Sequence, residues 1–132
     1  SWDLCDQCCM NLFDKTNMAW DKAKEWPQRE EEFIRRAGFA LMACLAWHDK
    51  KAKDEDFLKF FPIIKKYSVD DRNFVKKAVN WALRQIGKKN ANLNKEAIKL
   101  AEEIKNAKGA TKTAQWIAND AIRELKSKKF KK

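Results

Sequence analysis

Apolar side chains recur at three- and four-residue intervals along almost the whole of this 132-residue chain, and only 3 glycines and 2 prolines interrupt them. This spacing places apolar side chains on one face of an α-helix. The chain has almost none of the glycine-containing turns that join the two strands of a hairpin. The sequence therefore predicts an all-α fold, in a domain large enough to bury a core without disulfide bonds.

Short loops separate the helices that this pattern predicts. Pro27 suits the first turn of a helix, where its missing N–H is harmless. Asp54 is a plausible cap for one later helix, and Asp70 or Asp71 for the next. We expect a loop at 14–17 and a short segment at 18–26. Helices are expected at 2–13, at 27–48, and at 54–67 with a kink at Pro62. Three further helices are expected from the cap at 70 or 71 to Gly87, at 94–108 before Gly109, and at 111–125.

Helices of about 12 to 20 residues joined by short loops are typical of stacked helix pairs. We therefore predict an α-solenoid segment of antiparallel HEAT-like helix pairs over residues 1–126, followed by a basic tail over 127–132. The lysine-rich end, from Lys126 onward, is expected to be disordered. Phe33 and Phe74 are assigned to the buried apolar faces. A compact helical bundle has the same apolar faces, so periodicity alone leaves both arrangements open.

The chain carries 29 lysines and arginines against 19 aspartates and glutamates, which gives a net charge of +10. Such a charge favours a polyanion as the partner, and DNA, RNA and an acidic membrane surface all satisfy this condition. A lysine-rich surface that only confers solubility explains the same charge without any partner. Charge alone therefore does not decide the function.

The sequence contains no apolar run of the roughly 20 residues needed to span a bilayer and no signal-peptide pattern. We therefore expect a soluble, cytoplasmic protein with no membrane partner. Cys5, Cys8, Cys9 and Cys44 lack the spacing of a secreted disulfide framework and are expected to be reduced. Because Ser1 stands directly within a helical pattern, we expect the chain to be the C-terminal fragment of a longer one.

Trp2 and Asp6 are four residues apart in a predicted helix, so their side chains share one face. An aromatic ring beside a carboxylate suits a cationic ligand. Ordinary packing, with the acid near a helix N-terminus, explains the same pair. The residues alone favour packing over a ligand site.

A basic stripe with one aromatic residue follows one face of the helix that ends at Gly87. Lys77 precedes Trp81 by four residues, and Arg84 and Lys88 follow Trp81 by three and seven. Such a stripe can bind phosphates while the ring packs on a sugar or base. Solvated lysines beside a tryptophan at the edge of the core are an equally good interpretation.

Arg35 and Arg36 each follow a glutamate by four residues, so surface ion pairs with Glu31 and Glu32 explain both arginines. An arginine also suits a bidentate contact with phosphate. Successive residues diverge by about 100° around a helix, so only one of the two can point into a shared groove.

Cys44 and His48 lie one helical turn apart and could join Cys5, and Cys8 or Cys9, in a zinc site. These residues lie in predicted helices rather than on the turn of a zinc knuckle, and thiols readily fill helix-packing seams. We therefore expect no metal site. The sequence also contains no phosphate-binding glycine loop, and His48 at a helix C-terminus is explained by capping.

Four sequence blocks together resemble the DNA alkylation repair family of HEAT-like-repeat alkylpurine DNA glycosylases. The resemblance extends over nearly the whole chain, which would correspond to the C-terminal half to two thirds of a family member. The block at 74–84 is the most specific. The blocks are SWDLCD at 1–6, EFIRRA at 32–37, FVKKAVNWALR at 74–84 and WIANDAIREL at 116–125.

The resemblance implies a monomeric DNA glycosylase, without a cofactor, that excises positively charged N3- and N7-alkylated purines, such as 3-methyladenine and 7-methylguanine, from duplex DNA without base flipping. It implies that Trp2 and Trp81 flank the deoxyribose of the lesion. It also implies that Asp6 stabilises positive charge on the sugar and helps to place water, while Arg36 binds a backbone phosphate. Lys77, Arg84 and Lys88 are the further candidates for DNA binding. A non-catalytic DNA-binding scaffold and a protein-interaction solenoid are the alternatives.

Overall fold

The computed structural model describes residues 16–130, so the expected helix at 2–13 lies outside the described residues. Within 16–130 every regular element is helical and no strand occurs, which confirms the predicted all-α fold. The elements in chain order are α2 (Thr16–Glu25), the 3-10 turn η1 (Trp26–Gln28), α3 (Glu32–His48), α4 (Asp54–Leu58), α5 (Phe61–Tyr67), α6 (Asn73–Gly87), α7 (Ala91–Asn106) and α8 (Lys112–Ser127).

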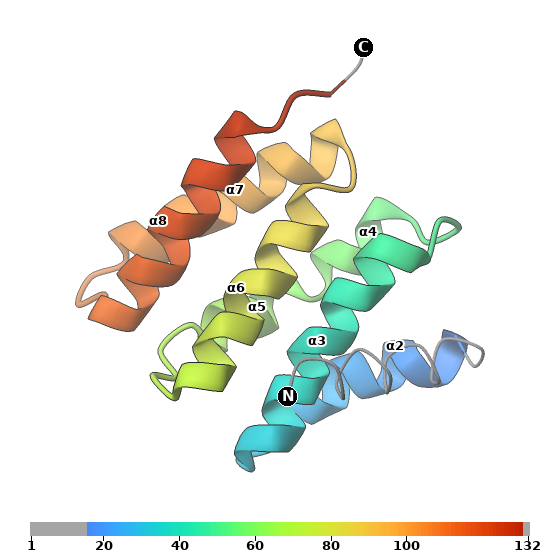
Figure 1. Ribbon diagram of the computed structural model, residues 1–132, viewed down its shortest axis with the longest axis horizontal. Coiled ribbons are helices and arrows are strands. Elements are labelled where there is room, and N and C mark those ends of the chain that lie inside the picture. Colours follow the sequence, from blue (N-terminus) through green and yellow to red (C-terminus); the bar gives the residue numbers. More distant parts are fainter. Residues whose placement is uncertain (1–15, 131–132) are drawn as a thin grey trace.

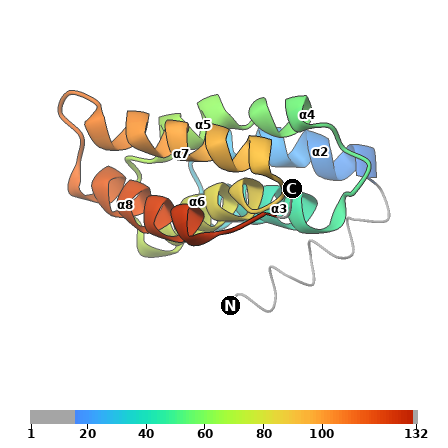
Figure 2. The same ribbon diagram turned by 90° about the horizontal axis from the view of Figure 1, so that it is seen from above.

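The helices form two layers. Helices α3, α6 and α8 lie side by side in one layer, and α2, α4, α5 and α7 form the second layer (Figures 1 and 2). The chain alternates between the layers, so that α2 pairs with α3, α4 and α5 with α6, and α7 with α8. Stacked helix pairs of this kind confirm the predicted solenoid-like fold. We call the surface of α3, α6 and α8 that is turned away from the second layer the front face.

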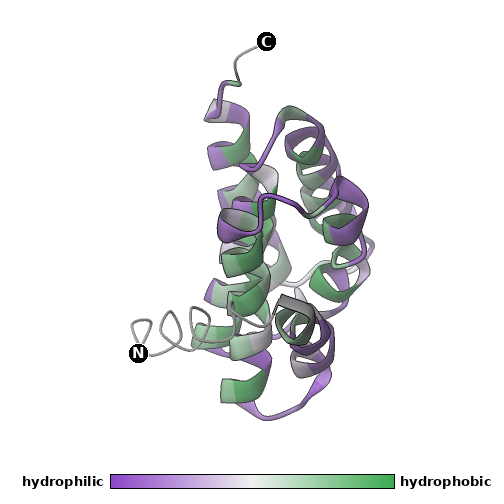
Figure 3. Ribbon diagram, turned by 90° about the vertical axis from the view of Figure 1, so that its right-hand side faces the viewer, coloured by the Kyte–Doolittle hydropathy of each residue, from purple (hydrophilic) through white to green (hydrophobic). Residues whose placement is uncertain are grey.

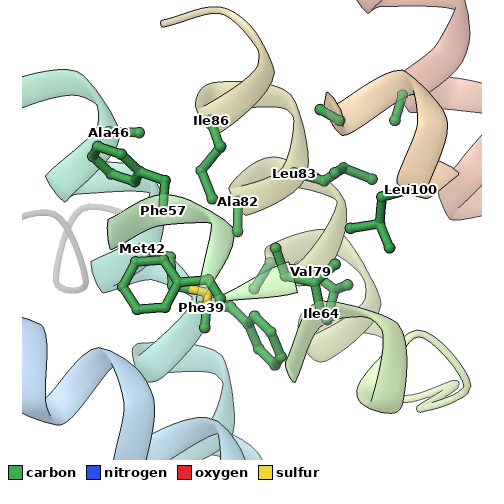
Figure 4. Packing of buried hydrophobic residues seen from close by; sticks show 14 of the residues in the cluster. Phe39, Met42, Ala46, Phe57, Ile64, Val79, Ala82, Leu83, Ile86 and Leu100 are labelled. Carbon is green, nitrogen blue, oxygen red and sulfur yellow. The ribbon is translucent and has the colours of Figure 1, made fainter. Parts of the chain in front are cut away.

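The hydrophobic core lies between the two layers (Figure 3). The rings of Phe39, Phe57 and Phe60 are fully buried there, and the indole of Trp20 stacks on Phe60 with a centroid distance of 5.2 Å. Full burial of a side chain of this size stabilises the fold by roughly 1.5–3 kcal/mol. Figure 4 shows the packing between α3 and α6, with Phe39, Met42, Ala46, Val79, Ala82, Leu83 and Ile86 among its members.

Pro27 packs directly on α3 at Gly38. A β-carbon at Gly38 would lie only 2.3 Å from Pro27 Cδ, so η1 approaches α3 closely because this residue has no side chain. The prediction that the long helix begins at Pro27 is wrong. Pro27 belongs to η1, the backbone at Arg29 and Glu31 is extended, and α3 begins at Glu32.

Pro62 separates two short helices instead of kinking a single one. Helix α4 ends at Leu58, and α5 begins at Phe61 with Pro62 in its first turn. A proline is tolerated in a first turn because its missing N–H would have no partner within the helix. The predicted single helix over 54–67 is therefore two.

The expected aspartate caps have other roles. Asp54 is the first residue of α4 rather than its cap, and its carboxylate accepts a hydrogen bond of 2.8 Å from the Asn90 amide. Neither Asp70 nor Asp71 caps α6, because Arg72 occupies the cap position. The Asp70 carboxylate accepts hydrogen bonds from Arg72 instead.

Three other helix limits differ slightly from the prediction. Helix α7 begins at Ala91 and not at Asn94, because the side chain of Asn90 caps it and accepts a hydrogen bond of 2.8 Å from the amide of Leu93. The segment at 16–25, expected as a loop followed by a short segment, is helix α2. At the other end α8 continues to Ser127, which we had assigned to the basic tail. The predicted end of α6 at Gly87 is confirmed.

Candidate nucleic-acid interface on the front face

Two rows of side chains follow the front face, one on α3 and one on α6. The residues within each row are separated by helical spacings, and on α6 they lie opposite the side that is buried in the core. Because α3 and α6 lie side by side (Figure 1), their helical spacing places the two rows along a common surface. The α3 row contains Phe33, Arg36 and Trp47, and the α6 row contains Phe74, Lys77, Trp81, Arg84 and Lys88.

Arg36 lies between two exposed aromatic rings. Its guanidinium carbon is 5.9 Å from the ring centroid of Phe33, on its own helix, and 5.0 Å from that of Phe74, on α6. Arg36 is only 2 % exposed, whereas Phe33 is 71 % and Phe74 is 43 % exposed. Two aromatic rings within cation–π distance restrict the orientation of a planar guanidinium, which favours directional hydrogen bonding. The prediction that both phenylalanines are buried in the core is therefore wrong.

Trp81 and Lys77 occupy the middle of the α6 row. Trp81 is partly buried and packs against the hydrophobic core, so the core restricts the position of its ring. Lys77, one helical turn earlier, is exposed, and no carboxylate within residues 16–130 forms an ion pair with it. An aromatic ring supported by the core and a solvated cation one turn away can contact a sugar and a phosphate together.

Arg84 and Lys88 are bound by acidic residues of the last helix. The Arg84 guanidinium donates from Nε to Asn80 at 2.7 Å and from Nη1 to Glu124 at 2.6 Å, and it lies 3.8 Å from Asp120. Lys88 pairs with the other carboxylate oxygen of Glu124. Burial would raise the pKa of Glu124, but hydrogen bonds from Lys88 and Arg84 outweigh it and lower the pKa. These two cations therefore also hold α8 against α6.

Arg35 points away from the front face. Its guanidinium donates to Asp70 at 2.8 Å and to the Pro27 carbonyl, and it lies 4.2 Å from the ring centroid of Tyr67. Glu31 pairs with Arg29 instead, so the interpretation of Arg35 as the partner of Glu31 is wrong. Arg35 and Arg36 point in different directions from α3, because consecutive residues diverge by about 100° around a helix.

Asp70 receives hydrogen bonds from two arginines. Burial would raise the pKa of Asp70, but hydrogen bonds from Arg72 and Arg35 outweigh it and lower the pKa to about 2. The same contact raises the pKa of Arg72. Because Asp70 follows α5 and Arg72 precedes α6, this cluster holds the loop between α5 and α6 against Arg35 of α3.

Trp2 and Asp6 lie outside the described residues, and so do Cys5, Cys8 and Cys9. Cys44 is buried in α3. Within residues 16–130 there is no group of three or more histidine, cysteine, aspartate or glutamate side chains that could hold a metal ion. In the same range no helix is both long enough and apolar enough to cross a membrane.

Several residues of the front face were not singled out from the sequence. Phe74 precedes Trp81 by seven residues, so its place on the same stripe could have been read from the spacing. The contact between Lys76 and the ring of Trp116, at 5.2 Å, and the pairing of Arg84 with Glu124 join α6 to α8. No spacing within one helix predicts contacts of this kind, because they depend on how the helices pack.

A comparison with known protein families matches residues 1–125 to the family described as DNA alkylation repair enzyme. No curated protein and no solved structure matches the chain. The match extends from the block at 1–6 to the last turn of α8 and includes both rows of the front face. Since nearly the whole sequence is matched, the chain belongs to the DNA alkylation repair enzyme family.

Proposed function

We propose that this protein is a DNA glycosylase that hydrolyses the N-glycosidic bond of positively charged N3- and N7-alkylated purines in duplex DNA. The observation that carries the proposal is the setting of Arg36, a nearly buried guanidinium between the exposed rings of Phe33 and Phe74. An oriented guanidinium is suited to a bidentate contact with one phosphate group. In this proposal the guanidinium of Arg36, which is 2 % exposed in the absence of DNA, becomes accessible when DNA binds and fixes the backbone beside the lesion.

The α6 row supplies the surface that continues from Arg36. Lys77 is exposed and available to a second phosphate, and Trp81 presents a ring that is packed on the core. A phosphate contact positions the duplex, while an aromatic ring can pack on a deoxyribose. Arg84 and Lys88 are proposed to bind DNA as well, and they would have to exchange their contacts with Glu124 for contacts with phosphate.

We assign the catalytic roles to Asp6, Trp2 and Trp81. The bond between C1′ and the purine nitrogen breaks, and its electron pair neutralises the cationic base, which leaves as a neutral alkylpurine. Positive charge then develops on the sugar, where a carboxylate and the faces of two indole rings stabilise it. Water adds to C1′ and loses a proton to solvent, which leaves an abasic site in the DNA.

A cationic purine is already a good leaving group, so the enzyme does not have to protonate the base. Stabilisation of the sugar cation from the backbone side is sufficient in this mechanism. We therefore propose that the base remains in the helix and is not extruded into a pocket, in contrast to most glycosylases. A protein acting in this way tolerates bulky alkyl groups on the purine.

The experiment measures the release of N7-methylguanine and 3-methyladenine from methylated duplex DNA by the full-length protein, in parallel with its binding to undamaged duplex. The proposal predicts release of both bases and strongly salt-dependent binding, because phosphate contacts displace counterions. Binding without any release would identify a non-catalytic DNA-binding scaffold. A protein that neither binds nor releases would instead be assigned to protein interactions, and both DNA proposals would be rejected.

A further inference from the structure

Trp47 is the most exposed tryptophan in the described part of the chain, and the proposed chemistry does not use it. It lies in the last turn of α3 and is 68 % exposed. Its ring stacks on that of His48, with a centroid distance of 5.2 Å and an angle of 29°. A large apolar side chain left in water at an ordered position, with its ring orientation restricted, is typical of a binding surface.

Trp47 borders a groove between the C-terminal ends of α3 and α6. The groove has a volume of about 360 Å³. Three of its side chains are lysines, and among the residues that the structure describes no aspartate or glutamate lines it. The lining consists of Ala46, Trp47, Lys50, Gln85, Lys88 and Lys89.

The three lysines differ in the contacts that they already make within the protein. Lys89 donates to the carbonyls of Ala46 and Asp49, so it holds the end of α3. Lys88 forms an ion pair with Glu124 of α8. Lys50 is exposed, and no carboxylate within residues 16–130 pairs with it. Lys50 is therefore the cation of this groove that can bind a ligand without breaking an existing contact.

Asp49 follows the end of α3, and its carboxylate forms no ion pair with the lysines of the groove among the contacts of residues 16–130. Asp49 accepts a hydrogen bond of 3.0 Å from the indole N–H of Trp20, and its other oxygen accepts from the backbone amides of Lys51 and Ala52. Its side chain is therefore used to close the turn after α3. The C-terminal ends of α3 and α6 carry partial negative charge. This opposes an anion, so the lysines are needed for any phosphate contact here.

The groove continues the two rows of the proposed DNA site. Trp47 follows Arg36 by eleven residues on the same side of α3, which is about 16 Å along the helix axis. Lys88 follows Trp81 by seven residues on α6, so both helices reach this groove about two to three turns beyond the site. A duplex lying along the front face at Arg36 and Trp81 would therefore extend towards Trp47 and Lys50.

We infer that Trp47 and Lys50 form a second contact with the sugar-phosphate backbone of duplex DNA, distant from the lesion. In this arrangement the indole of Trp47 packs on a deoxyribose, and the ammonium groups of Lys50 and Lys88 bind phosphates. The contact does not recognise any base, so it strengthens the binding of damaged and undamaged duplex equally. The inference rests on the proposed function, because it takes DNA as the ligand.

The test measures the binding of a fluorescein-labelled, undamaged duplex to the full-length protein by anisotropy, at several salt concentrations. Trp47→Ala is expected to weaken binding roughly three- to tenfold without changing the salt dependence, because an apolar contact releases no counterion. Lys50→Ala is expected to reduce the slope of log K against log salt by about 1. Lys99→Ala, an exposed charge change on α7 in the second layer, is the matched control and is expected to leave affinity nearly unchanged.

The variants also distinguish binding from folding. Trp47→Phe keeps an aromatic ring and is expected to retain most of the affinity that Trp47→Ala loses, with thermal unfolding equal to wild type.

Wild-type affinity and salt dependence in both Trp47→Ala and Lys50→Ala would overturn the inference. If wild type excises alkylpurines and both variants bind normally, only the second contact is refuted. If wild type neither binds nor excises, the proposed function fails together with it.

Discussion

Arg84 of α6 donates from Nη1 to Glu124 of α8 at 2.6 Å, and the other oxygen of the same carboxylate pairs with Lys88. One acidic residue therefore engages two of the cations that the sequence assigns to DNA binding. The contact stabilises the packing of the last helix on α6, and it also reduces the positive charge that the front face presents to a phosphate. In the proposed complex with DNA, stability and DNA affinity are thus opposed at Glu124.

Glu124→Gln is expected to bind undamaged duplex several-fold more tightly, with a salt dependence steeper by about 1 to 2, because Arg84 and Lys88 become available to phosphates. The same variant is expected to lose about 1 kcal/mol of unfolding free energy, since it removes two partly exposed ion pairs. Anisotropy titrations and urea unfolding measure the two effects. Glu103→Gln removes an equal charge from α7, away from the front face, and should change neither. Equal affinity of Glu124→Gln and wild type would show that the pair does not limit binding.

Asp70→Asn is expected to lower the unfolding free energy at pH 7 by roughly 2 kcal/mol, because the pKa of Asp70 falls from 3.8 to about 2 on folding. A carboxyl with a lowered pKa stabilises the fold above pH 4 and loses this effect as the pH falls through 2. Wild type should therefore lose stability between about pH 4 and pH 2, and Asp70→Asn should lose less over the same range. Urea unfolding at several pH values measures this. Asp71→Asn changes an exposed neighbour and should show the same dependence of stability on pH as wild type. Parallel curves of stability against pH for all three proteins would refute the role of Asp70.

Arg36→Lys is expected to reduce the excision of N7-methylguanine, measured as kcat/KM, by about tenfold or more, because an ammonium cannot make the bidentate phosphate contact of a guanidinium. Phe74→Leu keeps an apolar side chain but removes the ring from the guanidinium, and a smaller loss is expected. Arg29→Lys, in the exposed loop before α3, provides the control for a charge-preserving change. Excision by Arg36→Lys at the wild-type rate would remove Arg36 from the site.

Gly38→Ala is expected to destabilise the fold by about 1–3 kcal/mol, since the new β-carbon would overlap Pro27. The overlapping atoms are Cδ, Cγ and the backbone nitrogen of Pro27, and Pro27→Ala removes the first two but leaves the nitrogen. In a double-mutant cycle measured by thermal unfolding, the pair of substitutions should therefore cost less than the sum of the two single ones. Simple additivity would show that the two residues do not meet.

The helical fold followed from local properties of the sequence. Apolar periodicity predicted helix in the segments that form α3 to α8, although it began α3 at Pro27 and merged α4 with α5, and Gly87 marked the end of α6 correctly. The two wrong cap assignments occurred where a side chain found a distant partner. Asp54 bonds to Asn90, and Asp70 bonds to Arg35, so neither is left to cap its own helix. Contacts between distant segments override local capping preferences.

The front face was predicted only in part for the same reason. The stripe from Lys77 to Lys88 could be read from the spacing on one helix. The pairing of Phe33 with Phe74 around Arg36 could not, because it requires α3 and α6 to lie side by side. Phenylalanine is a residue type typical of a protein core, and only the packing of the two helices leaves these two rings in solvent.

The central claim is that this chain contributes a glycosylase site in which Asp6 stabilises a cationic sugar. The most direct measurement is single-turnover release of N7-methylguanine from duplex DNA by wild type and by Asp6→Asn, with duplex binding measured on the same samples. Asp6→Asn is expected to abolish release while binding is largely retained, because the amide keeps the shape of the carboxylate but not its charge. Release by Asp6→Asn at the wild-type rate would contradict this claim.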